Sequence, residues 1–287
     1  MKKPHVSIIT PCYNDGKYLP DAVESARESV KSGFCEHIIV DDGSDDKATL
    51  DYYKTLDPKK VKVIYAGRVG LGKARNIGIA AARCDYYLNI DADNKIHTDY
   101  PIKAAEILDK HPEAGVVYSN LKYFGARQDE LRVGAFNACN LLASNYIDSC
   151  AVIRKQTYED AGGYDENEML WEDWNFWHGV MNTPWKFYYL DETLFDYRVR
   201  HEGSLRTTAD QRGKEVENYI AGKHGSLYRE KFIELHQTLS ALSNNPLTLL
   251  EEIHKLKNDL DCLHRSKSWK FTTPLRWLYR VINFGKK

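Results

Sequence analysis

The first hundred residues alternate between short apolar segments and segments with helical periodicity. The apolar segments are rich in β-branched residues and end in polar or turn-forming residues, whereas the others repeat apolar residues every three or four positions. The strand-like segments are HVSIIT, EHIIVDDGS, KVKVIYAG and YYLNID. The helix-like segments are GKYLPDAVESARESV, KATLDYYKTL and GKARNIGIAAARC. This alternation predicts an α/β domain with a mostly parallel central sheet flanked by helices.

The remainder of the chain predicts two further regions. Residues 114–206 are rich in aromatic side chains, and GVVYSN and FYYLDETLFDYRV have the composition of strands. From about residue 209 the chain is helical and strongly charged, and TLLEEIHKLKNDLDCLHR carries an apolar stripe along one helical face. We therefore expect a main domain over residues 1–208, with halves at about 1–95 and 96–208, and a helical C-terminal extension over residues 209–287.

The composition argues against several classes of partner. The 287 residues carry a formal net charge of −1, so no overall basic field favours nucleic acid. No uninterrupted apolar run approaches the roughly 20 residues of a transmembrane helix. The six cysteines are scattered without a C-x-x-C pair, which is typical of free thiols in a reducing compartment. We expect a cytoplasmic protein without nucleic-acid partners, and the sequence leaves the oligomeric state open, a homodimer included.

Residues 265–287 combine basic and aromatic side chains without any acidic residue. This composition suits an anionic membrane interface, which would place the protein peripherally on the inner face of the cell membrane. A terminal helix packed on the main domain would explain the same residues equally well, and the sequence does not choose between the two.

Polar side chains follow the carboxyl ends of the predicted strands, where open α/β sheets bind their ligands. They are Tyr13 and Asn14, Asp41 and Asp42, and Asp91 and Asp93. Asp91 and Asp93 flank one small residue, and strand alternation would point both carboxylates to the same side. Two like charges in that arrangement are unfavourable unless a cation or water separates them. The alternative is an ordinary strand-to-turn junction, where aspartates cap backbone groups.

Three other motifs each have a structural and a functional interpretation. GRVGLGKA fits the phosphate-binding pattern G-x-x-x-x-G-K, but alanine follows the lysine where a magnesium-binding hydroxyl is needed, so a P-loop is not expected. WEDWNFW places Glu172 and Asp173 at the start of a helix, where acidic residues serve the helix dipole or catalysis. DYRVRHEGSLR brings His201 and Arg206 into a loop after a strand, as a metal ligand and a phosphate partner or as surface residues.

Taken together, the motifs SIITPCYN, VDDGSDD, GLGKARNIGIAAA, DAD, GGYDE and ED occur in an order and spacing that resemble glycosyltransferase family 2. The resemblance covers roughly residues 5–205 and implies the GT-A fold, a nucleotide-diphospho-sugar transferase fold. It makes residues 1–95 the nucleotide-sugar half and residues 96–208 the acceptor half. The C-terminal segment SKSWKFTTPLRWLYR also resembles that of many bacterial polysaccharide glycosyltransferases of the family.

The resemblance implies a role for each matching position. Pro11 and Tyr13 would line the nucleobase pocket, with Asp42 bonding the base and Asp41 nearby. Arg75 would face the nucleotide. Asp93 would bind the metal directly, with Asp91 nearer the ribose, and His201 would reach the metal or the diphosphate. Asp173 would be the catalytic base, with Glu172 beside it contacting the acceptor.

The expected reaction is the metal-dependent transfer of one sugar, with inversion, from a nucleotide-sugar donor to a glycan or lipid-linked acceptor in cell-surface polysaccharide synthesis. Carboxylate ligands favour Mg²⁺ or Mn²⁺, and a histidine ligand would favour Mn²⁺. UDP-sugar is the expected donor on family frequency, and the missing Q-x-x-R-W motif argues against processive synthesis. Two alternatives are a nucleotidyltransferase acting on sugar phosphates and a non-catalytic nucleotide-sugar-binding module. A nucleotidyltransferase should have a Gly-rich basic loop directly after the first strand, and TPCYNDGKYLP is not such a loop. The intact Asp91, Asp93 and Asp173 disfavour a non-catalytic module.

Overall fold

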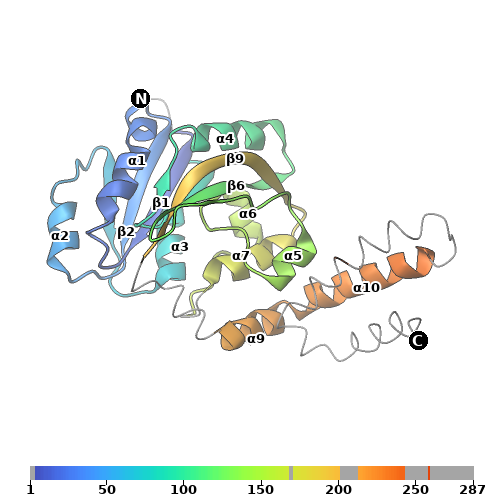
Figure 1. The fold of residues 1–287 in the computed structure, drawn as a ribbon. Coiled ribbons are helices and arrows are strands. Elements are labelled where there is room, and N and C mark those ends of the chain that lie inside the picture. The colour runs from blue at the N-terminus through green and yellow to red at the C-terminus, as the bar shows by residue number, and fades with distance from the viewer. Residues whose placement is uncertain (1–3, 168–170, 201–212, 243–257, 259–287) are drawn as a thin grey trace. The chain divides into compact units, whose positions relative to one another are not determined.

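The computed structural model describes residues 4–167, 171–200, 213–242 and 258, with side chains described up to residue 233 in the last helix. The chain divides into two compact units. The first comprises residues 1–136 and 147–205, and the second comprises residues 137–146 and 206–287. Each unit is described by itself below (Figure 1).

The described part of the first unit is built on one sheet of nine strands. Eight strands lie side by side in the order β3, β2, β1, β4, β8, β6, β9, β5, and β7 pairs with β6. The strands are β1 (Val6–Cys12), β2 (Cys35–Asp41), β3 (Val61–Tyr65), β4 (Tyr86–Asn89), β5 (Lys95–Ile96), β6 (Ala114–Gly125), β7 (Glu130–Leu131), β8 (Val152–Arg154) and β9 (Lys186–Val199).

Strand direction divides the sheet into a parallel half and a mixed half. β3, β2, β1 and β4 are mutually parallel, which confirms the arrangement predicted for the first hundred residues. β8 runs antiparallel to both β4 and β6, whereas β6 and β9 form a long parallel pair. The carboxyl ends of β1, β2 and β4 therefore meet at one edge, where a ligand of an α/β sheet is expected.

The described helices of the first unit cover both faces of this sheet (Figure 1). They are α1 (Leu19–Lys31), α2 (Lys47–Tyr53), α3 (Leu71–Ala81), α4 (Tyr100–Lys110), α6 (Lys155–Asp160) and α7 (Glu172–Met181). Proline lies in the first turn of α1, as predicted, because its fixed φ suits that position and its missing N–H has no helical partner there. α3 packs so closely on the sheet that a Cβ at Gly78 would lie 2.4 Å from the side chain of Ile9.

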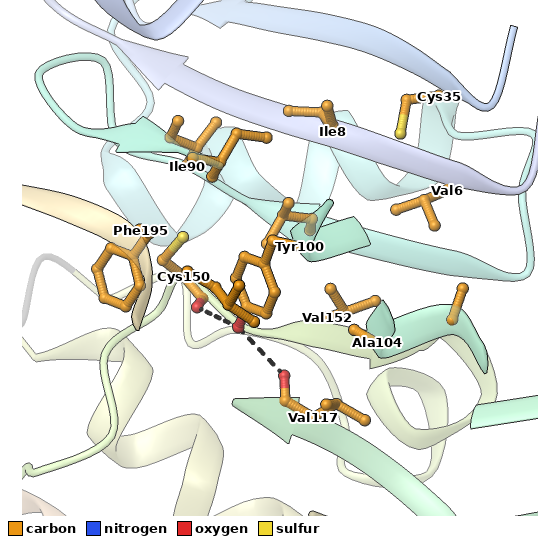
Figure 2. Packing of buried hydrophobic residues seen from close by; sticks show 14 of the residues in the cluster. Val6, Ile8, Cys35, Ile90, Tyr100, Ala104, Val117, Cys150, Val152 and Phe195 are labelled. Atoms are coloured by element: carbon orange, nitrogen blue, oxygen red, sulfur yellow. Dashed lines mark hydrogen bonds between the residues drawn. The ribbon is translucent and has the colours of Figure 1, made fainter. Parts of the chain in front are cut away.

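The main core lies between the sheet and helices α1 and α4 (Figure 2). Alternate β1 residues Val6 and Ile8 point into it and are fully buried, as strand alternation requires. Tyr100 of α4 is also fully buried, and its hydroxyl donates a hydrogen bond of 2.9 Å to the carbonyl of Cys150 (Figure 2). The buried phenol is thereby satisfied, and the segment that leads into β8 is fixed to the core.

The described part of the second unit is helical. It contains α5 (Ala138–Ala143), α9 (Gly213–Lys223) and α10 (Gly225–Leu242). Within this unit the hydroxyl of Tyr228 donates to the carbonyl of Leu142 at 3.2 Å. The helical character predicted beyond residue 209 is thus confirmed over residues 213–242, whereas the apolar stripe near residue 250 and the basic segment 265–287 lie outside the described residues. No helix in the described ranges is both long and apolar enough to cross a membrane.

Candidate functional site

The strand ends of β1, β2 and β4 gather the predicted donor-side residues at one edge of the sheet. Cys12 is in register with Asp41, and Ile9 is in register with Asn89, so the segments that follow these three strands lie next to one another. Pro11 lies buried within β1, and Tyr13, which follows the strand, is 41% exposed. The exposed ring of Tyr13 is the part of this pair that a ligand can reach.

Asp42 and Tyr13 are linked by Arg68. The Asp42 carboxylate is buried, and its Oδ1 accepts hydrogen bonds from the backbone N–H groups of Val69 at 2.6 Å and Gly70 at 2.9 Å. Arg68 donates to Oδ2 of Asp42, and its guanidinium lies 3.7 Å from the centroid of the Tyr13 ring. The predicted nucleobase residues therefore lie together, and an arginine that the sequence analysis did not single out covers them both.

Asp41 has different partners from its neighbour. The hydroxyl of Tyr53 donates to Oδ1 of Asp41 at 2.9 Å, and the backbone N–H of Ser44 lies within 3.3 Å of both carboxylate oxygens. Asp41 is the last residue of β2 and Asp42 follows the strand, so strand alternation does not relate the two side chains. In this structure Asp41 stabilises the turn and α2, while Asp42 lies on the side of Tyr13.

Arg75 is the most connected residue of the site. It lies on α3, is 1% exposed, and donates through Nη2 to Asp91 at 2.8 Å and to the Ser149 hydroxyl at 3.1 Å. Its Nη1 contacts the buried carboxylate of Glu172. Burial alone would lower the pKa of Arg75, but the nearby carboxylates, Asp91 first and then Asp173, raise it above the usual value. Arg75 is therefore a permanent cation enclosed by carboxylates.

The DAD segment directs its two carboxylates to different cations. β4 ends at Asn89, so Asp91 and Asp93 lie in the following turn, where strand alternation does not apply. Asp91 pairs with Arg75, whereas Oδ2 of Asp93 accepts from Nε of Arg200 at 2.6 Å. Burial raises the pKa of Asp93 to about 6, and the charges of Asp91 and Asp15 add to the rise while Arg200 opposes it. The segment therefore gathers two carboxylates whose charges are balanced by two different arginines in this structure.

The carboxylates of Asp91 and Asp93 are the described candidates for ligands of the predicted metal. Among the described residues, no group of three or more His, Cys, Asp or Glu side chains is arranged to hold a metal ion. Mg²⁺ and Mn²⁺ sites that also bind phosphates need only one or two carboxylates from the protein. Asp93, the predicted direct ligand, contacts a positive group, Arg200, in this structure. The donor set of Asp91 and Asp93 thus fits a hard divalent cation that a diphosphate helps to bind.

The predicted acceptor-side residues open helix α7. Trp171 precedes the helix in the left-handed region with φ of 65°, and Glu172 and Asp173 form its first turn. Glu172 is buried against Arg75, and Asp173 is partly exposed, with Oδ1 accepting from the backbone N–H of Trp174 at 2.8 Å. Through Arg75, the start of α7 is connected to the DAD segment, so the structure brings the predicted donor side and acceptor side together.

The GGYDE motif holds α7 and α3 in place. The backbone N–H of Tyr164 donates to Oδ1 of Asn76 at 3.0 Å, and Nδ2 of Asn76 donates back to the Tyr164 carbonyl at 2.9 Å. The Tyr164 hydroxyl accepts from Nδ2 of Asn89 at 2.7 Å. A Cβ at Gly72 would lie 2.1 Å from the carbonyl oxygen of Asp165, so only glycine allows this approach. The motif is therefore a structural support for the site.

Asp148 is a site residue that the sequence analysis missed. The segment 147–150 is fixed by several bonds, including that of Arg75 to Ser149 and one of 2.8 Å from the Cys150 N–H to Oδ1 of Asp148. Burial and the charges of Asp91 and Asp173 raise the pKa of Asp148 to about 7. The sequence YIDSCAV contains no motif that would have revealed it. Two further predicted residues, His201 and Arg206, lie outside the described part of the chain.

The chain is similar in sequence to known proteins. The sequence model of the family described as "Glycosyl transferase family 2" matches residues 7–162. The poly-beta-1,6-N-acetyl-D-glucosamine synthase of Staphylococcus epidermidis is 26% identical over 213 residues, which are 69% of this chain and 48% of the synthase. The minor teichoic acid biosynthesis protein GgaB of Bacillus subtilis is 25% identical over 229 residues, which are 75% of this chain and 25% of GgaB. The chain thus spans less than half the length of either relative.

Among solved structures, a crystal structure of S. aureus TarS residues 1–349 in complex with UDP-GlcNAc has a similar fold. It gives a TM-score of 0.62 at 21% sequence identity, and the alignment covers 91% of this chain and 81% of that one. This similarity confirms the fold predicted from the motifs.

Proposed function

This chain belongs to glycosyl transferase family 2, as predicted from its motifs, and we propose that it transfers a single sugar from a nucleoside diphosphate to a hydroxyl of a glycan or lipid-linked acceptor. The family is a class of glycosyltransferases, so the proposal concerns the substrates and the residues that act on them. The donor is a UDP-sugar, and the product is a cell-surface polysaccharide.

The observation that carries the proposal is the position of Arg75 between the two halves of the site. One guanidinium contacts Asp91, which belongs to the DAD segment, and Glu172, which precedes the proposed base Asp173. A direct transfer requires the donor and the acceptor hydroxyl to be held next to each other in the correct orientation. A rigid connection between the donor-binding and acceptor-binding segments supplies that requirement.

The proposed reaction is a single displacement. Asp173 accepts the proton of the acceptor hydroxyl as its oxygen attacks the anomeric carbon, and the bond from that carbon to the diphosphate breaks. The electron pair of that bond leaves with the nucleoside diphosphate, and attack from the opposite side inverts the configuration. Glu172, held by Arg75, contributes by fixing the first turn of α7, and Asp148 lies within the electrostatic influence of the same carboxylates. Partial exposure leaves Asp173 accessible to the acceptor.

On the donor side, Tyr13 offers an exposed ring for stacking on the base, and Asp42 offers a buried carboxylate that is linked to this ring through Arg68. Asp91 and Asp93 would hold Mg²⁺ or Mn²⁺ together with the diphosphate, and the roles of His201 and Arg206, which lie outside the described residues, stay predictions. When bound, the metal would supply positive charge that stabilises the leaving diphosphate. These assignments agree with the donor set of the DAD segment.

The names of the relatives support the choice of substrates. The neighbouring TarS structure contains UDP-GlcNAc, which supports a UDP-sugar donor. A poly-beta-1,6-N-acetyl-D-glucosamine synthase and a minor teichoic acid biosynthesis protein are both named for cell-surface polymers, which supports a glycan acceptor. Synthesis of such polymers on lipid carriers would occur at the inner face of the membrane, to which residues 265–287 would attach a cytoplasmic enzyme.

A thermal-shift panel tests this function. The purified chain is heated with UDP-GlcNAc, UDP-glucose, UDP-galactose, GDP-mannose and dTDP-glucose, each with and without Mn²⁺. A rise in Tm confined to UDP-sugars and larger with Mn²⁺ is expected, because a ligand that binds only the folded state stabilises it. Incubation of the best donor with lipid-linked acceptors then tests transfer by mass spectrometry. No shift with any nucleotide sugar would contradict the proposal.

A further inference from the structure

We propose that Arg200 is a donor-binding residue that occupies Asp93 in the free protein and moves to the diphosphate when metal and donor bind together. The inference rests on the proposed function, because it requires a diphosphate and a divalent cation at the DAD segment. It adds a residue, and a coupling between metal binding and donor binding, that the sequence motifs do not assign.

The contacts of Arg200 make it part of a built site. Its Nε lies 2.6 Å from Oδ2 of Asp93, and its Nη2 lies 2.8 Å from Oδ1 of Asp15. The guanidinium also lies 4.4 Å from the centroid of the Tyr18 ring. The side chains of Arg200, Asp93 and Asp15 are 15%, 17% and 22% exposed, respectively. Three segments, which follow β1, β4 and β9, thus enclose one largely buried cation.

The position of this cation conflicts with metal binding. Oδ2 of Asp93 cannot keep its hydrogen bond of 2.6 Å to Arg200 and also bind a metal through the same lone pair. A guanidinium and a divalent cation within a few ångströms also repel each other, and partial burial weakens the screening of that repulsion. The free protein should therefore bind metal weakly at Asp93.

A diphosphate removes the conflict. Its negative charge compensates both the metal and the guanidinium, and arginine is well suited to bind phosphate oxygens through two N–H groups. Asp15 can keep hold of one side of the guanidinium while Asp93 is released. Metal and donor then bind cooperatively, and by reciprocity each raises the affinity of the other by the same factor.

Two other arginines near the DAD segment, Arg75 and Arg198, are not available for this exchange. Arg75 is fully buried between two carboxylates. Arg198 donates to the backbone carbonyl of Asp93 at 2.9 Å and to Asp21 at 2.5 Å, and its guanidinium lies 4.2 Å from the centroid of the Phe124 ring. Arg200 alone among these three contacts the carboxylate that is predicted to bind the metal directly.

The experiment measures the binding of Mn²⁺ and the binding of UDP separately, under conditions without turnover. Mn²⁺ binding is followed by the loss of the free-ion electron paramagnetic resonance signal, with and without UDP, and UDP binding is measured by titration calorimetry with and without Mn²⁺. The variants are Arg200→Gln, which removes the charge, and Arg200→Lys, which keeps it without the planar fork. Lys103→Gln is the control, because it removes one charge from an exposed ion pair with Asp99 and Glu192.

For Arg200→Gln, we expect Mn²⁺ alone to bind about tenfold more tightly, and UDP in the presence of Mn²⁺ to bind about tenfold more weakly. Arg200→Lys should keep the weak binding of Mn²⁺ alone but lose affinity for UDP. Lys103→Gln should match the wild type in both. The opposite direction of the two effects separates an exchange from a general loss of structure, which would weaken both ligands.

The exchange would be overturned if Arg200→Gln left the affinity for Mn²⁺ alone unchanged or lowered it, or left the affinity for UDP unchanged. If the wild type bound UDP and Mn²⁺ cooperatively while Arg200→Gln did the same, the exchange would fail and the proposed function would stand. If the wild type bound neither ligand, the proposed function would fail together with the exchange.

Discussion

Arg75 contacts Glu172 although the two residues are 97 positions apart in the sequence. Their side chains are 2% and 8% exposed, so the pair is buried. The same guanidinium binds Asp91, and together these contacts connect α3 to the first turn of α7 and to the turn after β4. One side chain therefore connects the donor-side and acceptor-side segments directly.

Replacing this arginine should cost both stability and activity. Arg75→Met leaves the buried carboxylate of Glu172 without its cation, and loss of one partner of a buried ion pair typically costs about 3 kcal/mol of unfolding free energy. Urea unfolding followed by tryptophan fluorescence measures the loss. The double variant Arg75→Met with Glu172→Gln should recover part of it, because no buried charge then remains at position 172.

Arg27→Met is the matched control for that loss. Arg27 pairs with Glu24 at the surface, where both side chains are more than half exposed, so its removal should leave the unfolding free energy close to that of the wild type. If Arg75→Met unfolded at the same urea concentration as the control, the buried network would not have the role assigned to it.

One substitution can distinguish the loss of the proposed base from the loss of donor binding. Asp173→Asn keeps the size of the side chain but removes the proton acceptor, so transfer should fall by about 10²- to 10⁴-fold while UDP affinity stays at the wild-type value. Product formation and titration calorimetry give the two quantities. Asp51→Asn, at an exposed carboxylate that pairs with Lys54, serves as the control. Transfer at the wild-type rate by Asp173→Asn would exclude this residue as the base.

Stability should decrease in mild acid because of His37. This histidine is buried in β2 with its Nε2 at 2.8 Å from the hydroxyl of Thr10, and burial lowers its pKa from 6.5 to about 4. The unfolded chain keeps an ordinary histidine pKa near 6.5 and therefore binds the proton more readily. The stabilisation is complete above that value and is lost progressively as the pH falls toward 4.

The contribution of His37 is isolated by comparing the wild type with His37→Gln. Between pH 7 and pH 4.5, the wild type should lose roughly 2 kcal/mol more unfolding free energy than the variant, as measured by urea unfolding at each pH. Equal losses in the two proteins would show that other groups determine the acid sensitivity. The glutamine can accept the hydrogen bond of Thr10, so the comparison does not add an unpaired hydroxyl.

The contact between α3 and the GGYDE motif predicts a glycine-specific effect. In Gly72→Ala, the new Cβ would lie 2.1 Å from the carbonyl oxygen of Asp165, so the backbone must shift, at a cost of about 2 kcal/mol. Gly222→Ala in α9 meets nothing within 4 Å and should stabilise by about 0.5–1 kcal/mol, because alanine is the better helix former. Thermal unfolding of the two variants should therefore shift in opposite directions, and equal shifts would contradict the close contact.

In the first half of the chain, the sequence predicted the strands and helices better than it predicted which side chains contact one another. The apolar segments became β1 to β4 because buried parallel strands need continuous apolar residues, and this pattern is visible locally. The neighbouring carboxylates were harder to assign. Asp41 and Asp42 are neighbours of the same residue type, yet Asp41 contacts Tyr53, whereas Asp42 is linked to Tyr13 through Arg68.

Strand alternation does not predict the directions of the two carboxylates in the DAD segment. The interpretation that both carboxylates share one face depended on a strand that reaches Asp93, whereas β4 ends at Asn89. The two side chains consequently contact different arginines, Arg75 and Arg200. Neither pairing could be read from the sequence, because these partners come from other elements of the fold. For the same reason Asp148 and Ser149, which belong to no motif, were missed.

Helix α3 meets the chain at three points within little more than one turn: Gly72 at the backbone of Asp165, Arg75 at Asp91 and Glu172, and Asn76 at Tyr164. This has a consequence for engineering chimeras. An acceptor half taken from another family member would have to match all three contacts, although α3 itself belongs to the donor half. Exchanging residues 96–208 together with α3 should therefore preserve the site better than exchanging them alone.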